Sequence, residues 1–113
     1  MNEKVVDAKA VVDYTSQLKP GTACDVMNDK YAVAENNVVT ISFSGWAKSN
    51  AGGDMVIATI PTALRPNINN LFFTAFDHTL KTALGCRISG TNIIVNNLKT
   101  GNAFWIAVTY VKK

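Results

Sequence analysis

This sequence has few of the side chains that most enzymes use for catalysis. It contains one histidine, His78, and the second half of the chain, residues 55–113, contains a single acid, Asp77. General acid–base catalysis needs a positioned partner group, and glycoside hydrolysis needs two carboxylates. The Gly52–Gly53 pair lacks the following Lys-Ser/Thr of a phosphate loop. We therefore expect a protein that is not an enzyme, with no catalytic residues and no cofactor.

Cysteine is also scarce. Cys24 and Cys86 lie far apart and match no metal-ligand spacing, so no metal site is expected. A disulfide between them is one alternative, and two free buried thiols are the favoured one, because nothing marks secretion. The first residues, MNEKVVDAKAVVDY, carry charges where a signal peptide has its apolar core. We expect synthesis in a reducing cytosol and, without a run of about 18 apolar residues, no membrane insertion.

Charged residues make up only 17% of the chain, against about 25% in typical globular domains, while hydrophobic residues make up 48%. So little charge on a small domain indicates that a partner covers part of the surface. The formal net charge is +3, and the basic residues are scattered. Nucleic-acid-binding proteins usually show a basic stripe interleaved with aromatic residues, so no nucleic-acid partner is expected.

The N-terminal segment, residues 1–21, differs in composition from the rest. Residues 3–19 are rich in Ala, Lys and Asp and have the pattern of a short helix with apolar residues near heptad spacing. So short a helix is marginal in water, so this segment, helical or extended, either packs on the domain or associates with copies of itself. Lys-Pro-Gly at 19–21 ends it. We therefore divide the chain into this segment, a possible trimerisation stem, and a head domain, residues 22–113.

From residue 22 onward the pattern is that of short β-strands. One hairpin is expected around residues 35–37, and its second strand directs Val39, Ile41 and Phe43 to the core. A second hairpin is expected around Ser89–Gly90. Seven or eight strands at near ten-residue spacing favour an all-β sandwich or jelly roll over alternating βαβ units.

The last predicted strand, within residues 102–111, is apolar on both faces. One face carries Phe104, Ile106, Val108 and Tyr110, and the other carries Ala103, Trp105, Ala107 and Val111. A strand in a small domain normally needs only one apolar face. The second face, with its tryptophan, therefore requires an explanation, such as an oligomer interface or a ligand.

Five residues are candidate ligand contacts by their chemistry alone: Trp46, Asp77, His78, Arg87 and Trp105. Each tryptophan lies on the less core-like face of its strand, where burial under a loop, an oligomer interface and an aromatic platform for a sugar ring are all open alternatives. If Asp77 and His78 lie within a strand, they point to opposite faces and do not form a catalytic pair. At the end of a strand, the alternative is that both face a loop.

Three stretches, in this order, carry a resemblance to a known family: NNVVTISFSGWA, MVIATIPTALRPN and NAFWIAVTYV. Together they resemble the C-terminal head domains of phage tail fibre and baseplate receptor-binding proteins, especially from phages and prophages of Gram-positive bacteria. The resemblance covers roughly residues 30–113. Its most specific part is Ile60-Pro61 followed by Arg65-Pro66, where Leu64 stands at a position that is commonly aromatic in the family.

The resemblance implies a β-sandwich or jelly-roll head that forms a homotrimer and binds saccharides of the host cell wall in clefts between protomers. It also implies other tail or baseplate proteins as partners, synthesis in the bacterial cytoplasm and a final location in the virion, at the tail tip or baseplate. In such a trimer, Trp105, Ala103 and Ala107 would pack against a neighbouring copy. The alternatives are a structural virion or appendage protein that binds no saccharide and, less favoured without a secretion signal, a trimer like C1q or tumour necrosis factor.

Overall fold

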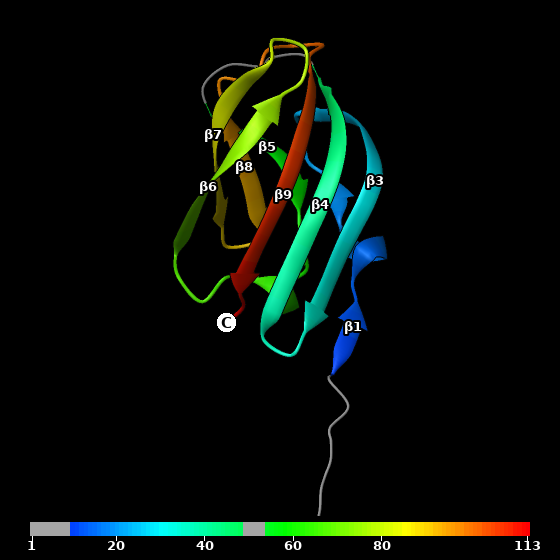
Figure 1. Ribbon diagram of the computed structural model, residues 1–113, viewed down its shortest axis with the longest axis vertical. Coiled ribbons are helices and arrows are strands. Elements are labelled where there is room, and N and C mark those ends of the chain that lie inside the picture. The colour runs from blue at the N-terminus through cyan, green and yellow to red at the C-terminus, as the bar shows by residue number, and fades with distance from the viewer. Residues whose placement is uncertain (1–9, 49–53) are drawn as a thin grey trace, which may run out of the picture.

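The computed structural model describes residues 10–48 and 54–113, and these residues form an all-β structure without an α-helix (Figure 1). The strands are β1 (Val11–Asp13), β2 (Lys19–Pro20), β3 (Cys24–Glu35), β4 (Val38–Ala47), β5 (Asp54–Thr59), β6 (Asn70–Asp77), β7 (Thr82–Ser89), β8 (Asn92–Asn96) and β9 (Ala103–Val111). Two short 3₁₀ turns, η1 (Thr15–Gln17) and η2 (Thr62–Leu64), connect β1 to β2 and β5 to β6. The all-β class predicted from the sequence is confirmed.

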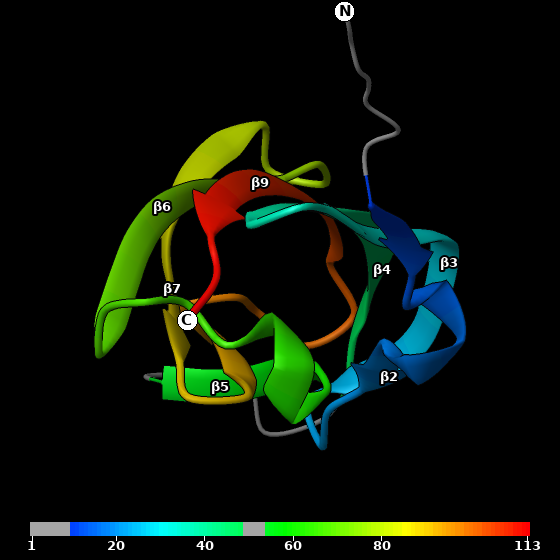
Figure 2. The same ribbon diagram turned by 90° about the horizontal axis from the view of Figure 1, so that it is seen from below.

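The nine described strands form one antiparallel sheet in the order β1-β3-β4-β9-β6-β7-β8-β5-β2. Seen from below, this sheet curls around a central core, and its two ends approach each other (Figure 2). Both end strands come from one short segment, residues 11–20, which we call the clasp. Because β2 pairs with β5 and also lies against β3, the clasp joins the two ends of the curled sheet.

The clasp corrects one expectation from the sequence. For residues 10–21 the helical alternative is wrong and the extended alternative holds, because the backbone finds sheet partners that a short isolated helix lacks. Leu18 is fully buried, and its carbonyl accepts a hydrogen bond from Lys30 Nζ at 3.1 Å. The rest of the expected helix lies outside the described residues, and the role of residues 1–21 as a stem stays a prediction.

Both predicted hairpins are confirmed. β3 and β4 are joined by a tight turn in which Asn36 has a φ of 55°, and β7 and β8 are joined by a turn in which Gly90 has a φ of 60°. Asparagine and glycine are the residues that adopt this left-handed conformation most readily. The predicted loop at 48–54 falls mostly outside the described residues.

The core lies inside the curl, and the alternation seen in the sequence places it correctly. Val39, Ile41 and Phe43 of β4 are at most 2% exposed. Phe43 meets Phe104 of β9 edge to face, with the ring centroids 6.0 Å apart. Cys24 and Cys86 are both free and buried, in agreement with the favoured alternative.

The last strand, β9, also holds the Ile-Pro…Arg-Pro segment, residues 60–66, in place. The hydroxyl of Tyr110, in β9, donates to the carbonyl of Leu64 at 2.6 Å, and Leu64 is fully buried. Directly after the strand, the Lys113 amide donates to the Arg65 carbonyl at 2.7 Å. These contacts fix the connection between β5 and β6 against the end of β9.

One irregularity of the sheet prepares the site. β9 pairs with β4 along its full length, but it pairs with β6 only at Phe76↔Trp105 and Asp77↔Phe104. The rest of β6 pairs with β7 alone and diverges from β9 (Figure 1). The outward side of the sheet is therefore interrupted between these two strands.

Candidate functional site

A groove of about 660 Å³ lies on the outside of the sheet where β6 diverges from β9. We call it the Trp105 groove. Its aromatic residues are Phe76 and Trp105, and its polar side chains come from three different strands: Ser42, Ser44, Thr74 and Asp29. The groove thus combines ring surfaces with hydroxyl groups and one carboxylate.

Trp105 is the central ring of the groove. It is 50% exposed, although it lies in the middle of a nine-stranded sheet. His78 stacks on it with ring centroids 4.4 Å apart and an interplanar angle of 20°, and Phe76 lies 5.5 Å away at 36°. Lys81 Nζ is 3.2 Å from His78 Nδ1. An ammonium group has no acceptor, so with Lys81 charged the ring nitrogen accepts this bond.

Asp77 holds the corner that positions these rings. It is 1% exposed, and its two carboxylate oxygens accept hydrogen bonds from the Leu80 amide and from Asn102 Nδ2, both at 2.9 Å. The next residue, His78, donates its amide to the Ala103 carbonyl at 2.9 Å. Asp77, the last residue of β6, therefore points inward and fixes the β6–β9 contact, while His78, in the turn that follows, points outward and stacks on Trp105. Of the two alternatives for this pair, opposite directions hold, although His78 lies beyond the end of the strand.

Trp46 lies near the groove but does not line it. It stands on the outward face of β4, opposite Ala103 of β9, while Trp105 is opposite Ser44. The two tryptophans are thus diagonal neighbours across the β4–β9 ladder. Trp46 is 49% exposed, nearly the same as Trp105. Ala103 itself is only 9% exposed.

Arg87 lies elsewhere on the sheet. It points outward from β7, as its alternation with Cys86 and Ile88 predicts, and its guanidinium pairs with Asp54 at 3.0 Å. Ala83, four residues earlier on β7, lines the Trp105 groove, which places Arg87 about 13 Å further along the strand. Of the five predicted residues, the structure brings together His78, Trp105 and Trp46, puts Asp77 beneath them and separates Arg87.

The polar rim of the groove was not predicted as a site. Ser42 and Ser44 alternate with core residues of β4, so their outward direction is visible in the sequence, but their closeness to Trp105 depends on the β4–β9 pairing. Asp29 reaches the groove because β3 bulges between Asn28 and Tyr31, where Asp29 has a φ of 53°. Aspartate is among the residues that tolerate a positive φ. Its presence at position 29 is the one feature of the local sequence that is consistent with a bulge there.

An apolar ring surface with a rim of hydroxyl groups suits a ligand that has one apolar face and a hydrogen-bonding edge.

In the described part of the chain, no group of three His, Cys, Asp or Glu residues is placed to hold a metal ion. Within the same residues, no helix is long and apolar enough to span a membrane. No family model matches this chain, and no curated protein matches it. The site must therefore be interpreted from its own geometry.

Proposed function

We propose that this protein is a receptor-binding head of a phage tail fibre or baseplate, and that it recognises host cell-surface saccharides through the Trp105 groove. The observation that carries this proposal is the half-exposed indole of Trp105, which lies beside Phe76 under a rim of serine and threonine hydroxyls. The C–H face of a pyranose is apolar and stacks on an aromatic ring. Its hydroxyl edge hydrogen-bonds to polar side chains.

The wider setting of this proposal comes from the sequence resemblance. It includes a jelly-roll or sandwich fold, other tail or baseplate proteins as partners, synthesis in the bacterial cytoplasm and a location at the tail tip. An antiparallel sheet curled around its core is compatible with that fold class.

The proposal also includes a homotrimer. Among residues 10–48 and 54–113, eleven large hydrophobic side chains are at least 45% exposed in the single chain. On the outward face, Val38 and Val111 form a register pair between β4 and β9, and they are 45% and 47% exposed. Exposed apolar side chains of this number support burial against other copies.

Binding to purified Gram-positive cell walls, and to an array of surface-immobilised glycans, tests the proposed function. Multivalent display is needed, because single-site glycan affinities are low. The Trp105→Ala variant is expected to weaken binding at least about tenfold, which corresponds to about 1.4 kcal/mol. Trp46→Ala is the matched control, because it removes an equally exposed tryptophan from the neighbouring strand. We expect this control to bind like the wild type.

Thermal melts of both variants establish that the fold is retained. Equal binding by the wild type and a folded Trp105→Ala variant would contradict the groove as the saccharide site. If the wild type binds no cell wall and no glycan even when displayed multivalently, the structural alternative replaces the proposed function.

Light scattering at micromolar concentration tests the trimer separately. The expected mass is that of three chains, and a monomer would contradict the assembly without touching the groove. Trp105→Ala distinguishes the two roles considered for this residue. A trimer that dissociates on this change has Trp105 in its interface, whereas one that persists while glycan binding is lost has it in the ligand site.

A further inference from the structure

A second groove, of about 370 Å³, lies on the outside of the sheet across β6, β7 and β8. We call it the Arg87 groove. Register places Phe72, Arg87 and Ile94 in one row on three adjacent strands. Phe72 is the most exposed large hydrophobic residue described, at 74%. The row therefore sets one cationic side chain between two apolar ones on an open surface.

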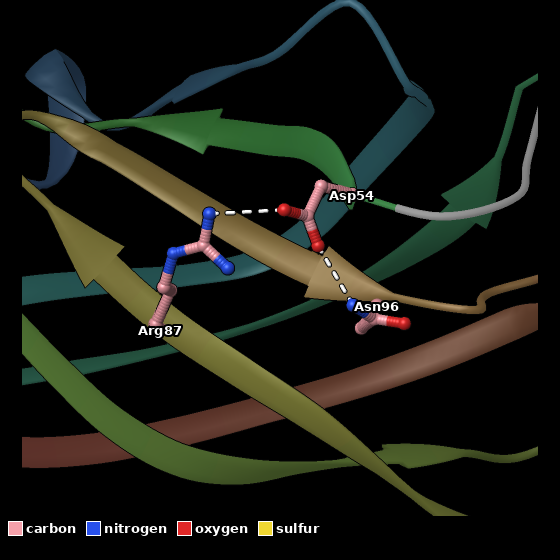
Figure 3. A network of polar contacts seen from close by, with 3 residues as sticks. All are labelled: Asp54, Arg87 and Asn96. Atoms are coloured by element: carbon pink, nitrogen blue, oxygen red, sulfur yellow. Dashed lines mark hydrogen bonds and ion pairs between the residues drawn. The ribbon is translucent and has the colours of Figure 1, made fainter.

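Arg87 is held in a fixed position from one side. Its terminal nitrogen Nη2 is 3.0 Å from Asp54 Oδ2, and Asp54 Oδ1 accepts a second bond from Asn96 Nδ2 at 2.7 Å (Figure 3). Asp54 and Asn96 are opposite each other in the β5–β8 ladder. Both carboxylate oxygens are thus engaged, and the backbone pairing of two strands fixes the carboxylate against which the guanidinium rests.

As far as the described residues show, the rest of the guanidinium is available to a ligand. It has five N–H donors in a planar fork, and its bond to Asp54 is the one that it makes within residues 10–48 and 54–113. In Figure 3 the second terminal nitrogen of Arg87 makes no contact with the other residues drawn. Among the described residues that line the groove, Arg87 is the one that carries a charge, and its partner Asp54 lies outside the lining. The groove therefore offers a preoriented cation with free donors.

We propose that the Arg87 groove binds an anionic ring: a sugar or similar cyclic molecule that carries a carboxylate or phosphate group. The anion takes paired hydrogen bonds from the free edge of the guanidinium, for which a planar fork is suited. The apolar face of the ring rests on Phe72, which is directly opposite Arg87 in the β6–β7 ladder. Carboxylate and phosphate share this chemistry, and the experiment below separates them.

This site is independent of the Trp105 groove. The two grooves share no lining residue. Their electrostatics also differ, since Asp29 is the one charged residue among those that line the Trp105 groove, whereas Arg87 lines the second groove. Neutral saccharide binding at Trp105 can fail without affecting anion binding at Arg87, and the reverse also holds.

A ligand titration followed by two-dimensional NMR of the ¹⁵N-labelled full chain tests the proposal. The probes are glucuronic acid and glucose 6-phosphate, with glucose as the neutral match and inorganic phosphate as the anion without a ring. We expect one or both of the acidic sugars to shift the amide signals of Phe72, Gly85, Arg87 and Asn96. Glucose is expected to leave these signals unchanged at the same concentration. Comparison of the two acids shows whether the carboxylate or the phosphate is preferred.

Two variants remove the site in different ways. Arg87→Gln removes the cation and is expected to weaken binding of the acidic sugars at least about tenfold. Gly85→Val fills the groove instead, because Gly85 lines it. The larger side chain can be accommodated, since a Cβ at Gly85 meets no atom within 4 Å and a β-branched residue suits a strand. It should fold at least as well as the wild type and bind none of the probes. Trp105→Ala is the control that leaves this groove intact.

Several outcomes would overturn the proposal. They are no shift with either acid, equal shifts with glucose and glucuronic acid, and undiminished binding by folded Arg87→Gln or Gly85→Val. Inorganic phosphate that binds as tightly as glucose 6-phosphate would remove the ring and Phe72 from the recognition. Loss of acid binding in Trp105→Ala would show that the two grooves are one site.

Discussion

At the scale of single residues, Gly45 shows how tightly the inside of the curl is packed. A Cβ at this position of β4 would overlap the backbone carbonyl oxygen of Val26, and it would lie 2.9 Å from the Phe104 ring and 3.2 Å from Cys24 Sγ. Gly45→Ala is therefore expected to lower the free energy of unfolding by about 1–3 kcal/mol. Urea denaturation measures the change.

The matched control for this change is Gly85→Ala. Gly85 is also a strand glycine, but its missing side chain would meet open space. Alanine there is expected to be neutral or slightly stabilising, because glycine loses more backbone entropy on folding. Equal destabilisation by both changes would mean that the cost comes from strand conformation rather than from the close approach at Gly45.

Single residues also mark where reasoning from sequence succeeds. The outward direction of Trp105, Trp46 and Arg87 follows from simple alternation, and all three are outward in the structure. Their grouping does not follow, because it depends on which strands are neighbours. Alternation placed Asp77 on one side with Leu71, Phe73 and Ala75 but did not identify that side as the core, and its bond to Asn102 joins residues far apart in sequence.

At the scale of elements, Leu18 anchors the clasp. In the sequence Leu18 lies between η1 and β2, and its side chain is fully buried. Because the clasp contains both end strands of the sheet, this one side chain secures them both. Leu18→Ala is expected to cost about 2–5 kcal/mol of stability. Hydrogen exchange should show that the Tyr14 amide next to β1, which donates to the Ala32 carbonyl, and the Gly21 amide next to β2, which donates to the Ile57 carbonyl, lose protection together, since one anchor serves both. Gln17→Ala, an exposed neighbour, is the control and is expected to change neither stability nor exchange.

Loss of protection at only one of these two places would contradict the common anchor.

The same segment shows a limit of prediction from sequence. β1 and β2 have three and two residues, and all five are exposed. A strand this short and without a buried face leaves no periodic signal. In β4, by contrast, every second residue from Val39 to Ala47 is buried, and the alternation in the sequence had directed Val39, Ile41 and Phe43 to the core.

At the scale of the whole molecule, buried protonated groups set the response to alkaline conditions. Burial raises the pKa of the Cys86 thiol from 9.0 to about 12, and burial also raises the pKa of Tyr110. The folded protein therefore retains protons that the unfolded chain releases first. Stability is fully present below pH 9 and is lost as the pH rises from 9 towards 12, by about 1.4 kcal/mol per pH unit for Cys86 alone.

Urea denaturation between pH 8 and pH 11, in the presence of a reductant, measures this slope. Cys86→Ala is the matched variant, because it keeps a small apolar side chain without the titrating group. Its stability is expected to fall less steeply than that of the wild type over the same range. Identical slopes would show that Cys86 does not titrate differently in the folded and unfolded chains.

The pairing of β4 with β9 has a consequence for how the chain reaches this fold. Thr40 is opposite Thr109, a separation of 69 residues. During synthesis the β3–β4 hairpin emerges early, but the open edge of β4 has no native partner until residues near position 111 leave the ribosome. Completion of the sheet therefore waits for β9, and it is expected on the millisecond-to-second scale typical of β proteins with distant contacts. Until then that edge is the surface most in need of protection from other chains.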